Sequence, residues 1–340
     1  MNETNATIAS NETVLTPQWA PLPVCLLLTF LTGFTGNGLL LMVFATHRAL
    51  WTPFNVYVVN LLVANFCCIV TQFPFDVYST LYGGWGLGER VCDFYISAAW
   101  FFQPVIFNSH QMIAINRIWA VSHPISYRRI HSIRTAVSLC CGVWVYVFVG
   151  LSVGVIQDRL YHRLPLDTSG CQLDPMPQFV WAVVIQVVYI IWPQIVMVVA
   201  LVVIFMAKRA KNRINMAMHS TVASQGGGAQ LSRRSGGDSV PHPTAGGDEH
   251  DSQQKKPNRP VQRSNGTLLL VLLTLSVTVC WTPNNVYYSW FFFDQQLNIP
   301  VFSAITIILI AFQATVDPIM FTLAFPSLRL ALRQTFSFRT

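Results

Sequence analysis

Residues 175–207 read PMPQFVWAVVIQVVYIIWPQIVMVVALVVIFMA and contain no Lys, Arg, Asp or Glu. A helix of about 20 apolar residues crosses the roughly 30 Å of hydrocarbon in a bilayer, so this stretch is long enough for one crossing. Backbone groups in lipid must be hydrogen-bonded within the segment, as they are in a helix, whereas a transmembrane barrel would need shorter segments of alternating polarity. The stretch therefore predicts a membrane-spanning helix.

The same pattern occurs seven times along the chain. Charge-free, mostly apolar tracts cover residues 13–47, 49–75, 94–116, 135–157, 175–207, 264–293 and 295–316. A composition with 53% hydrophobic and 10% charged residues leaves too little charge for the surface of a soluble protein. We expect an all-α fold, a seven-transmembrane helix bundle within residues 21–325, with spans at about 22–46, 54–78, 91–119, 134–156, 179–207, 265–292 and 299–324.

The distribution of charge predicts the orientation of the bundle. Loops rich in Lys and Arg stay in the cytoplasm, and with an outside N-terminus the inner segments hold 18 of the 21 basic residues against four acids. Three glycosylation sequons, at Asn2, Asn5 and Asn11, agree with this orientation. We expect a multi-pass plasma membrane protein whose residues 1–20 are extracellular and glycosylated, and whose basic side faces anionic lipids rather than nucleic acid.

Two of the eight cysteines lie on the outer side of the membrane, one at the start of the third predicted helix and one in the second outer loop. These are Cys92 and Cys171, and the other six lie within spans, where cysteine behaves as a small apolar residue. The outer side is an oxidising compartment. We therefore expect a disulfide that ties the second outer loop to the top of the third helix.

Two cytoplasmic segments differ in composition from the spans. Residues 208–264 combine basic, Gly, Ser and Pro residues and are too polar to form a core, so we expect a disordered third intracellular loop. Residues 326–340 alternate leucines with Arg329 and Arg333 and predict a short amphipathic helix on the inner leaflet, followed by a tail.

Polar and proline residues interrupt the apolar tracts in a definite order. They are Gly36-Asn37, Asn60 to Asn65, Asn116-Arg117-Ile118, Trp144, Pro193, Cys280-Trp281-Thr282-Pro283 and Asp317-Pro318-Ile319-Met320-Phe321. With the predicted bridge, this order resembles the rhodopsin-like (class A, family 1) G-protein-coupled receptors over all seven helices. The resemblance implies a receptor without enzymatic activity or cofactor, with a heterotrimeric G protein, arrestin, receptor kinases and membrane lipids as partners.

The resemblance also assigns a switch and a coupling end. Prolines within spans create kinks, so Pro283 and Pro318 mark deformable points, and Trp281 lies beside the first of them below the expected ligand pocket. In the family, the residue matched by Arg117 receives the tail of the G protein. Here Asn116, Ile118 and Phe321 replace the family's acid and two tyrosines, and the loss of the acid predicts raised activity without ligand.

A second departure concerns the middle of the bundle. Asn65 stands where the family has Asp, and Asp317 stands where many members have Asn, so the pair looks exchanged. A carboxylate in low dielectric needs a partner or a proton. The sequence leaves open a sodium or water site and a neutral hydrogen bond between the two side chains. His110, in the inner half of the third helix, is expected to be a hydrogen-bonded intrahelical histidine.

The family's geometry predicts an outward-facing ligand pocket that is aromatic and rich in amides. The residues projected into it are Ala99, Trp100, Gln103, Gln186, Tyr189, Trp281, Asn284, Asn285, Tyr288 and Ile307. Apolar walls with few polar groups suit a small neutral or amphipathic molecule. Asp76, Asp93 and Asp294 near the helix mouths suit a basic peptide equally well, so the ligand stays open.

Two positions set the chain apart from well-known branches of the family. Amine receptors carry an Asp seven residues after the third-helix Cys, where this chain has Ala99. Opsins carry the retinal-binding Lys seven residues before the Pro of the seventh helix, where this chain has Ala311. We therefore expect an orphan-like receptor that is neither an opsin nor a typical monoamine receptor.

Other function classes are weighed against a signalling receptor. An atypical seven-helix receptor that scaffolds or scavenges without G-protein coupling fits the changes at Asn116, Ile118 and Phe321. A transporter would be expected to show inverted repeats or several intramembrane charges, and the sequence shows neither. An intramembrane enzyme would need converging nucleophiles, carboxylates or metal ligands, which His110 and Asp317 do not supply.

Overall fold

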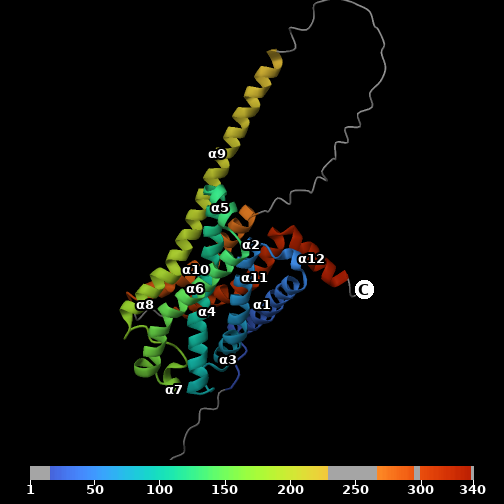
Figure 1. Cartoon of the computed structure of the whole chain (residues 1–340). Coiled ribbons are helices and arrows are strands. Elements are labelled where there is room, and N and C mark those ends of the chain that lie inside the picture. Colours follow the sequence, from blue (N-terminus) through green and yellow to red (C-terminus); the bar gives the residue numbers. More distant parts are fainter. Residues whose placement is uncertain (1–15, 229–265, 295–298, 338–340) are drawn as a thin grey trace, which may run out of the picture.

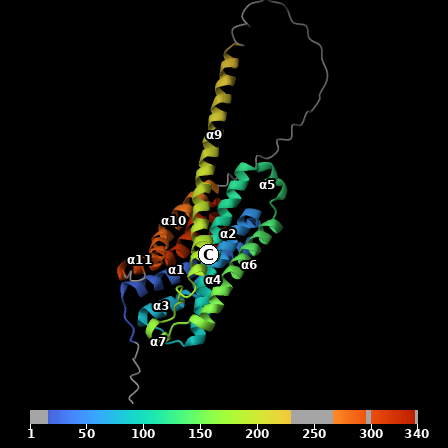
Figure 2. The same ribbon diagram turned by 90° about the vertical axis from the view of Figure 1, so that its left-hand side faces the viewer.

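The computed structural model describes residues 16–228, 266–294 and 299–337. The predicted glycosylation sites Asn2, Asn5 and Asn11 lie outside these residues. Within the described ranges the chain forms one bundle of helices without a strand, so the predicted all-α fold is confirmed. Figures 1 and 2 show the bundle from two perpendicular directions.

Seven helical crossings form the bundle. Six are long and apolar enough to span a membrane, whereas α4 is more polar because it packs against α2, α6 and α9. In chain order the crossings are α1 (Pro21–Thr46), α2 with α3 (Pro53–Thr71 and Phe73–Tyr82), α4 (Glu89–Ser122), α6 (Ile133–Gln157), α8 with η3 and α9 (Phe179–Ile185, Gln186–Ile191 and Trp192–Gly228), α10 (Gly266–Phe291) and α11 (Pro300–Ala324).

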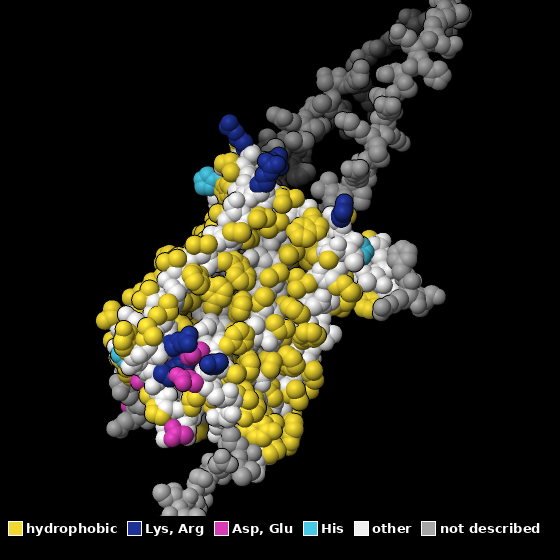
Figure 3. Space-filling model, turned by 60° about the horizontal axis from the view of Figure 1, so that its bottom comes forward, with side chains coloured by type: hydrophobic (Ala, Val, Ile, Leu, Met, Phe, Trp, Pro, Cys, Tyr) yellow, Lys and Arg dark blue, Asp and Glu magenta, His cyan; other side chains and the backbone are white. Residues whose placement is uncertain are grey.

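The surface of the bundle is that of a multi-pass membrane protein. Figure 3 shows a wide hydrophobic face, with charged groups gathered toward its two ends. Large apolar side chains such as Val145, Phe148 and Val149 are each 61% exposed. In water such a surface would drive aggregation, so lipid is the environment in which this fold is stable.

The second crossing is broken, although the sequence predicts one helix over residues 54–78. Helix α2 ends at Thr71, and α3 begins at Phe73 with Pro74 in its first turn. Because proline lacks an N–H and disfavours helix in the preceding residue, the helix is interrupted here. Helix α3 then continues to Tyr82 and ends at Gly83, whose φ of 65° is favourable only for residues such as glycine.

The fifth crossing also differs from its prediction. Residues 186–191 form the π-helical segment η3, just before Pro193, and α9 continues to Gly228, beyond the predicted end at 207. The first part of the predicted disordered loop, 208–228, is therefore helical. This stretch has neither Gly nor Pro before residue 226 and is rich in Ala, Lys, Arg and Met, which favour helix. Figure 1 shows α9 projecting beyond the bundle.

The two ends of the bundle are marked by different features. The predicted disulfide between Cys92 and Cys171 is present and joins the start of α4 to the segment before α8; we call this the disulfide end. The opposite end holds Arg117 and the amphipathic helix α12 (Pro326–Ser337), which buries Leu328 against α1 and α11. The remaining short elements are η1 (Arg48–Leu50), α5 (Pro124–Ile130), η2 (Asp158–His162) and α7 (Leu166–Ser169).

Candidate functional site

A cavity of about 210 Å³ lies among α4, α8, η3, α10 and the break between α2 and α3, in the half of the bundle that carries the disulfide; we call it the main cavity. Seven of the ten predicted ligand residues line it: Ala99, Trp100, Gln103, Gln186, Trp281, Asn284 and Tyr288. Gln72, Tyr95, Pro104, Ile185 and Ile190 complete the lining and were not predicted. The cavity thus has the aromatic and amide character expected from the sequence, without a charged side chain in its wall.

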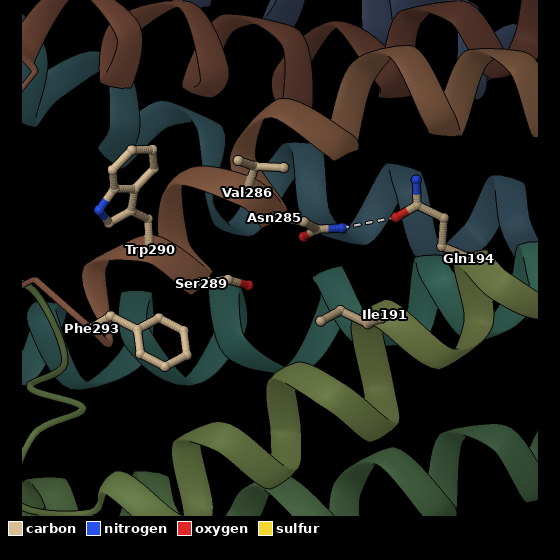
Figure 4. Close-up of a pocket in the computed structure, with 7 residues that line it drawn as sticks. All are labelled: Ile191, Gln194, Asn285, Val286, Ser289, Trp290 and Phe293. Atoms are coloured by element: carbon tan, nitrogen blue, oxygen red, sulfur yellow. Dashed lines mark hydrogen bonds between the residues drawn. The ribbon is translucent and has the colours of Figure 1, made fainter.

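The other three predicted ligand residues lie elsewhere. Tyr189 turns toward α6, where its ring stacks on Tyr146 with centroids 4.5 Å apart. Asn285 lines a separate groove beside α10, where its Nδ2 donates to Gln194 Oε1 at 3.0 Å, as Figure 4 shows. This groove faces the outside of the bundle, because Trp290 in its wall is 57% exposed.

Ile307 lines a second cavity, of about 240 Å³, between α1, α3, α4 and α11; we call it the side cavity. Gln72, Tyr95 and Gln103 line both cavities, so the two adjoin at these three side chains. Asp76 also lines the side cavity, whereas the sequence predicts only that it lies near a helix mouth. In the sequence, Pro74 is the signal that the helix changes direction near this position.

The base of the main cavity is formed by Trp281. Its side chain is 3% exposed and packs edge-to-face on Phe107, with ring centroids 4.1 Å apart. The next residue is Thr282, whose Oγ1 accepts a hydrogen bond from Gln194 at 2.6 Å, which links α10 to α9. Pro283 lies in the interior of α10. A ligand that displaces Trp281 would therefore press on the segment of α10 that proline has weakened.

A buried polar network lies below this tryptophan, at the middle of the bundle. Asp317 accepts hydrogen bonds from Asn65 Nδ2 at 2.8 Å and from Gln313 Nε2 at 2.6 Å, and His110 Nε2 lies 3.2 Å from its Oδ1. The next residue, Pro318, is buried inside α11. The exchanged pair identified in the sequence is thus in direct contact, and His110 is a third member that the sequence did not connect with it.

At the opposite end, the Arg117 guanidinium has no ion-pair partner among the described residues. Its Cζ lies 3.2 Å from the centroid of the Phe54 ring. Its Nε and Nη2 are buried without a hydrogen bond. A cation–π contact stabilises it by at most a few kcal/mol. The group is therefore poised for an acceptor from outside the bundle.

The residues next to Arg117 bond to other groups. Asn116 Oδ1 accepts a hydrogen bond from the Tyr127 hydroxyl at 3.3 Å, and Asn116 Nδ2 donates to His131 Nε2 at 3.0 Å. Ile118 packs against the apolar cluster between α4, α9 and α10. Phe321 is fully buried in the larger apolar cluster. The three departures from the family pattern are thus accommodated by a short polar chain and by apolar packing.

The contact between Asn116 and His131 makes this end sensitive to acid. Burial lowers the pKa of His131 below its ordinary value of 6.5, and the nearby charge of Arg117 lowers it further. As the pH falls below 6.5, the unfolded chain binds this proton more readily than the folded chain, so the free energy of unfolding decreases. We expect a lower midpoint of thermal unfolding at pH 5.5 than at pH 7.5. The drop should shrink in His131→Gln, and an equal drop in both proteins would contradict the assignment.

Comparison with known proteins gives a consistent result. The family model described as 7 transmembrane receptor (rhodopsin family) matches residues 36–321. Melanopsin from Felis catus is 25% identical over 321 residues, which cover 91% of this chain and 59% of that protein. Tyramine receptor 1 from Locusta migratoria is 28% identical over 218 residues, covering 62% and 45% of the two chains. Melanopsin from Homo sapiens is 32% identical over 141 residues, covering 38% and 30%. The chain thus matches at most about three fifths of the length of these relatives.

Proposed function

Because the chain belongs to the rhodopsin family of seven-transmembrane receptors, we propose that it carries a signal from an extracellular ligand to a heterotrimeric G protein at the plasma membrane. In this proposal the N-terminus and the disulfide end face outward, and Arg117 faces the cytoplasm. The observation that carries the proposal is the state of Arg117, which is partly buried and has no ionic partner within the described bundle.

The state of Arg117 favours a partner that inserts from the cytoplasm. A guanidinium presents five N–H donors, and carbonyl or carboxylate groups are its natural acceptors. A peptide that enters beside α4 would supply such groups once the inner ends of α9 and α10 move apart. Trp281 lies two residues before Pro283 in α10, on the side of the proline that leads to the cytoplasmic end. Occupation of the main cavity and opening of the cytoplasmic end would therefore act on the same helix.

The two cavities favour a small ligand over a folded peptide. The main cavity encloses about 210 Å³ and the side cavity about 240 Å³. Pockets for drug-sized ligands enclose about 300 to 1,000 Å³, so each of the two cavities is smaller than such a pocket. Ala99 lies in the wall of the main cavity and Ala311 in the wall of the side cavity. Amine receptors have an Asp at the first of these positions, and opsins have the retinal-binding Lys at the second. Here both positions carry only a methyl group, which supports a ligand that is neither retinal nor a monoamine bound at position 99.

The proposal is tested by expressing the chain in cells that carry activation sensors for each class of G protein. Activation is measured first without ligand and then with pools of lipids, amines and peptides. We expect at least one sensor to respond above the level of cells without the chain. If the chain reaches the surface and no sensor responds, coupling is contradicted. The changes at Asn116, Ile118 and Phe321 would then support the alternative, a receptor that scaffolds or scavenges.

The resting activity of the native chain should exceed that of Asn116→Asp. The aspartate would place a carboxylate next to Arg117 and give the guanidinium an ion-pair partner, which holds it within the bundle. We expect ligand-independent output to fall several-fold, consistent with about 1 kcal/mol for such a pair. The measurement is second-messenger output at matched surface expression, with the exposed Arg134→Ala as a control at the same end. Equal output from the native chain and Asn116→Asp would refute this role.

A further inference from the structure

A carboxylate lies in the wall of the side cavity, within the membrane-crossing segment Pro53–Tyr82. It belongs to Asp76, in the first turn of α3. Its Oδ1 accepts a hydrogen bond from the Tyr95 hydroxyl at 2.6 Å, and its Oδ2 accepts one from Gln72 Nε2 at 3.0 Å. Both donors are neutral, so the contacts orient the carboxylate without neutralising it.

The side chains that orient Asp76 are themselves held in place. Gln103 Nε2 donates to Gln72 Oε1 at 3.1 Å, and this bond fixes the Gln72 amide with its own donor toward Asp76. A carboxylate has room for about four hydrogen bonds, and two are made here. The remaining lone pairs are available to a group inside the side cavity.

Two other acids in this half of the bundle are paired with arginines. Asp93 contacts Arg159 at 3.0 Å and Arg163 at 3.1 Å, and Asp158 contacts Arg163 at 2.7 Å. Within the described ranges, no ion pair includes Asp76. An acid inside a membrane span is costly without a counter-charge and marks a functional site when it faces a cavity. The side cavity thus provides a lined space and an anion, and none of the residues that line it is cationic.

We propose that the side cavity binds the ammonium group of an organic cation, with Asp76 as its counter-ion. The apolar or aromatic body of the same ligand occupies the main cavity, above Trp281, and the ligand crosses between the two spaces beside Gln72, Tyr95 and Gln103, which line both. The ring of Tyr95 adds a π-face beside the cation. This inference refines the ligand class of the receptor proposed above and rests on that function, although Asp76 is separate from the position that Ala99 occupies.

The test uses two matched probes that differ in one group: tyramine, a compact aromatic ammonium, and tyrosol, in which a hydroxyl replaces the ammonium. Binding is measured on the purified full chain in lipid nanodiscs, from the rise of the thermal unfolding midpoint with probe concentration. We expect tyramine to bind at least tenfold more tightly than tyrosol. In Asp76→Asn, tyramine should lose about 10- to 100-fold in affinity, as expected for a hydrogen bond between charged groups, while tyrosol should be unaffected.

Two further variants separate this result from general damage to the fold. The exposed acid Asp167, in α7, provides a control, because Asp167→Asn removes the same charge from the same end and should leave both affinities unchanged. Ala311 lines the side cavity, so Ala311→Lys should place an ammonium near Asp76 and abolish the preference for tyramine while the acid is retained.

The proposal is overturned if the native chain binds both probes equally, or if Asp76→Asn and Ala311→Lys both retain the preference for tyramine. Loss of the preference in Asp167→Asn would also overturn it, because the effect would then come from surface charge. The assay contains no G protein. A chain that fails to activate any G protein can therefore still show this preference, and failure of the preference leaves coupling untouched.

Discussion

Replacing Arg117 with alanine is expected to reduce G-protein activation to the level of cells that lack the chain, both without ligand and with it. The guanidinium has two buried nitrogens without acceptors and rests on the Phe54 ring. Acceptors from a G protein would form charge-assisted hydrogen bonds worth about 1.5 to 3 kcal/mol each. Loss of one or two of them weakens the complex by at least about tenfold.

The same substitution should leave the fold intact. Removing a cation that is partly buried and has no ionic partner does not strand a carboxylate, and it ends the desolvation cost of the guanidinium. We therefore expect Arg117→Ala to unfold at the native temperature or slightly above it. Activity and stability would then move in opposite directions, which distinguishes a coupling residue from a packing residue.

Two companion variants complete this test. Arg117→Lys keeps the charge but loses the planar fork of donors, so it should retain only part of the activity. Arg134→Ala removes an exposed arginine from the first turn of α6, at the same end, and should retain most of it. Activation by Arg117→Ala equal to that of the native chain at matched surface expression would exclude the proposed coupling role.

The membrane crossings were predictable because each one must be apolar over its own length. The fourth predicted span, 134–156, differs by one residue at each end from α6, Ile133–Gln157. The disulfide was predictable because Cys92 and Cys171 were the only cysteines on the outer side. The first inference needs only the apolar composition of one stretch, and the second needs only the number of cysteines on one side of the membrane. Neither requires knowledge of which helices are neighbours.

The side chains that share a cavity were less predictable, because one residue changes the direction of a helical side chain by about 100°. Asn284 lines the main cavity, whereas its neighbour Asn285 bonds to Gln194 in the groove of Figure 4. The π-helical turn η3 shifts the direction again, so Tyr189 packs on Tyr146 instead of lining the main cavity. No sequence pattern indicated this turn beyond the proline that follows it.

Contacts between distant spans were the least predictable. His110 was expected to be an intrahelical histidine with a hydrogen bond, and its Nδ1 does contact the carbonyl of Ile106 at 2.9 Å. Its other nitrogen faces Asp317, which is 207 residues away in the sequence. The exchange of Asn65 and Asp317 showed that the middle of the bundle was unusual, but it carried no information about a partner on α4.

This histidine leads to the second large prediction, that the native chain is insensitive to sodium and that His110→Leu becomes dependent on it. The carbonyl of Ile106 requires an N–H at His110 Nδ1. A hydrogen bond across the 3.2 Å between His110 Nε2 and Asp317 Oδ1 then requires one further proton, carried by either group. An imidazolium with a carboxylate and an imidazole with a carboxylic acid carry the same net charge of zero. We therefore infer that the pair has no need of a metal cation, and favour the neutral network over a sodium site.

Leucine at position 110 removes the proton-bearing partner and leaves Asp317 with the amides of Asn65 and Gln313. Breaking a buried charge pair at one side costs about 3 to 5 kcal/mol, so the unfolding midpoint should fall strongly. Sodium can then bind the carboxylate and restore part of the loss. The measurement compares unfolding in sodium chloride and in potassium chloride at equal ionic strength, because potassium carries the same charge on a larger ion and is not an organic ammonium.

The double variant His110→Leu, Asp317→Asn provides the matched control. It removes both members of the pair, and the new amide can still bond to Asn65 and Gln313, so it should recover much of the stability lost in His110→Leu. It should also lose the response to sodium, because no carboxylate remains. If the native chain unfolds at a higher temperature in sodium than in potassium, a sodium site at Asn65 and Asp317 gains support. If His110→Leu shows no such difference, the carboxylate does not bind sodium even without the histidine, and the proposed exchange of proton for cation is wrong.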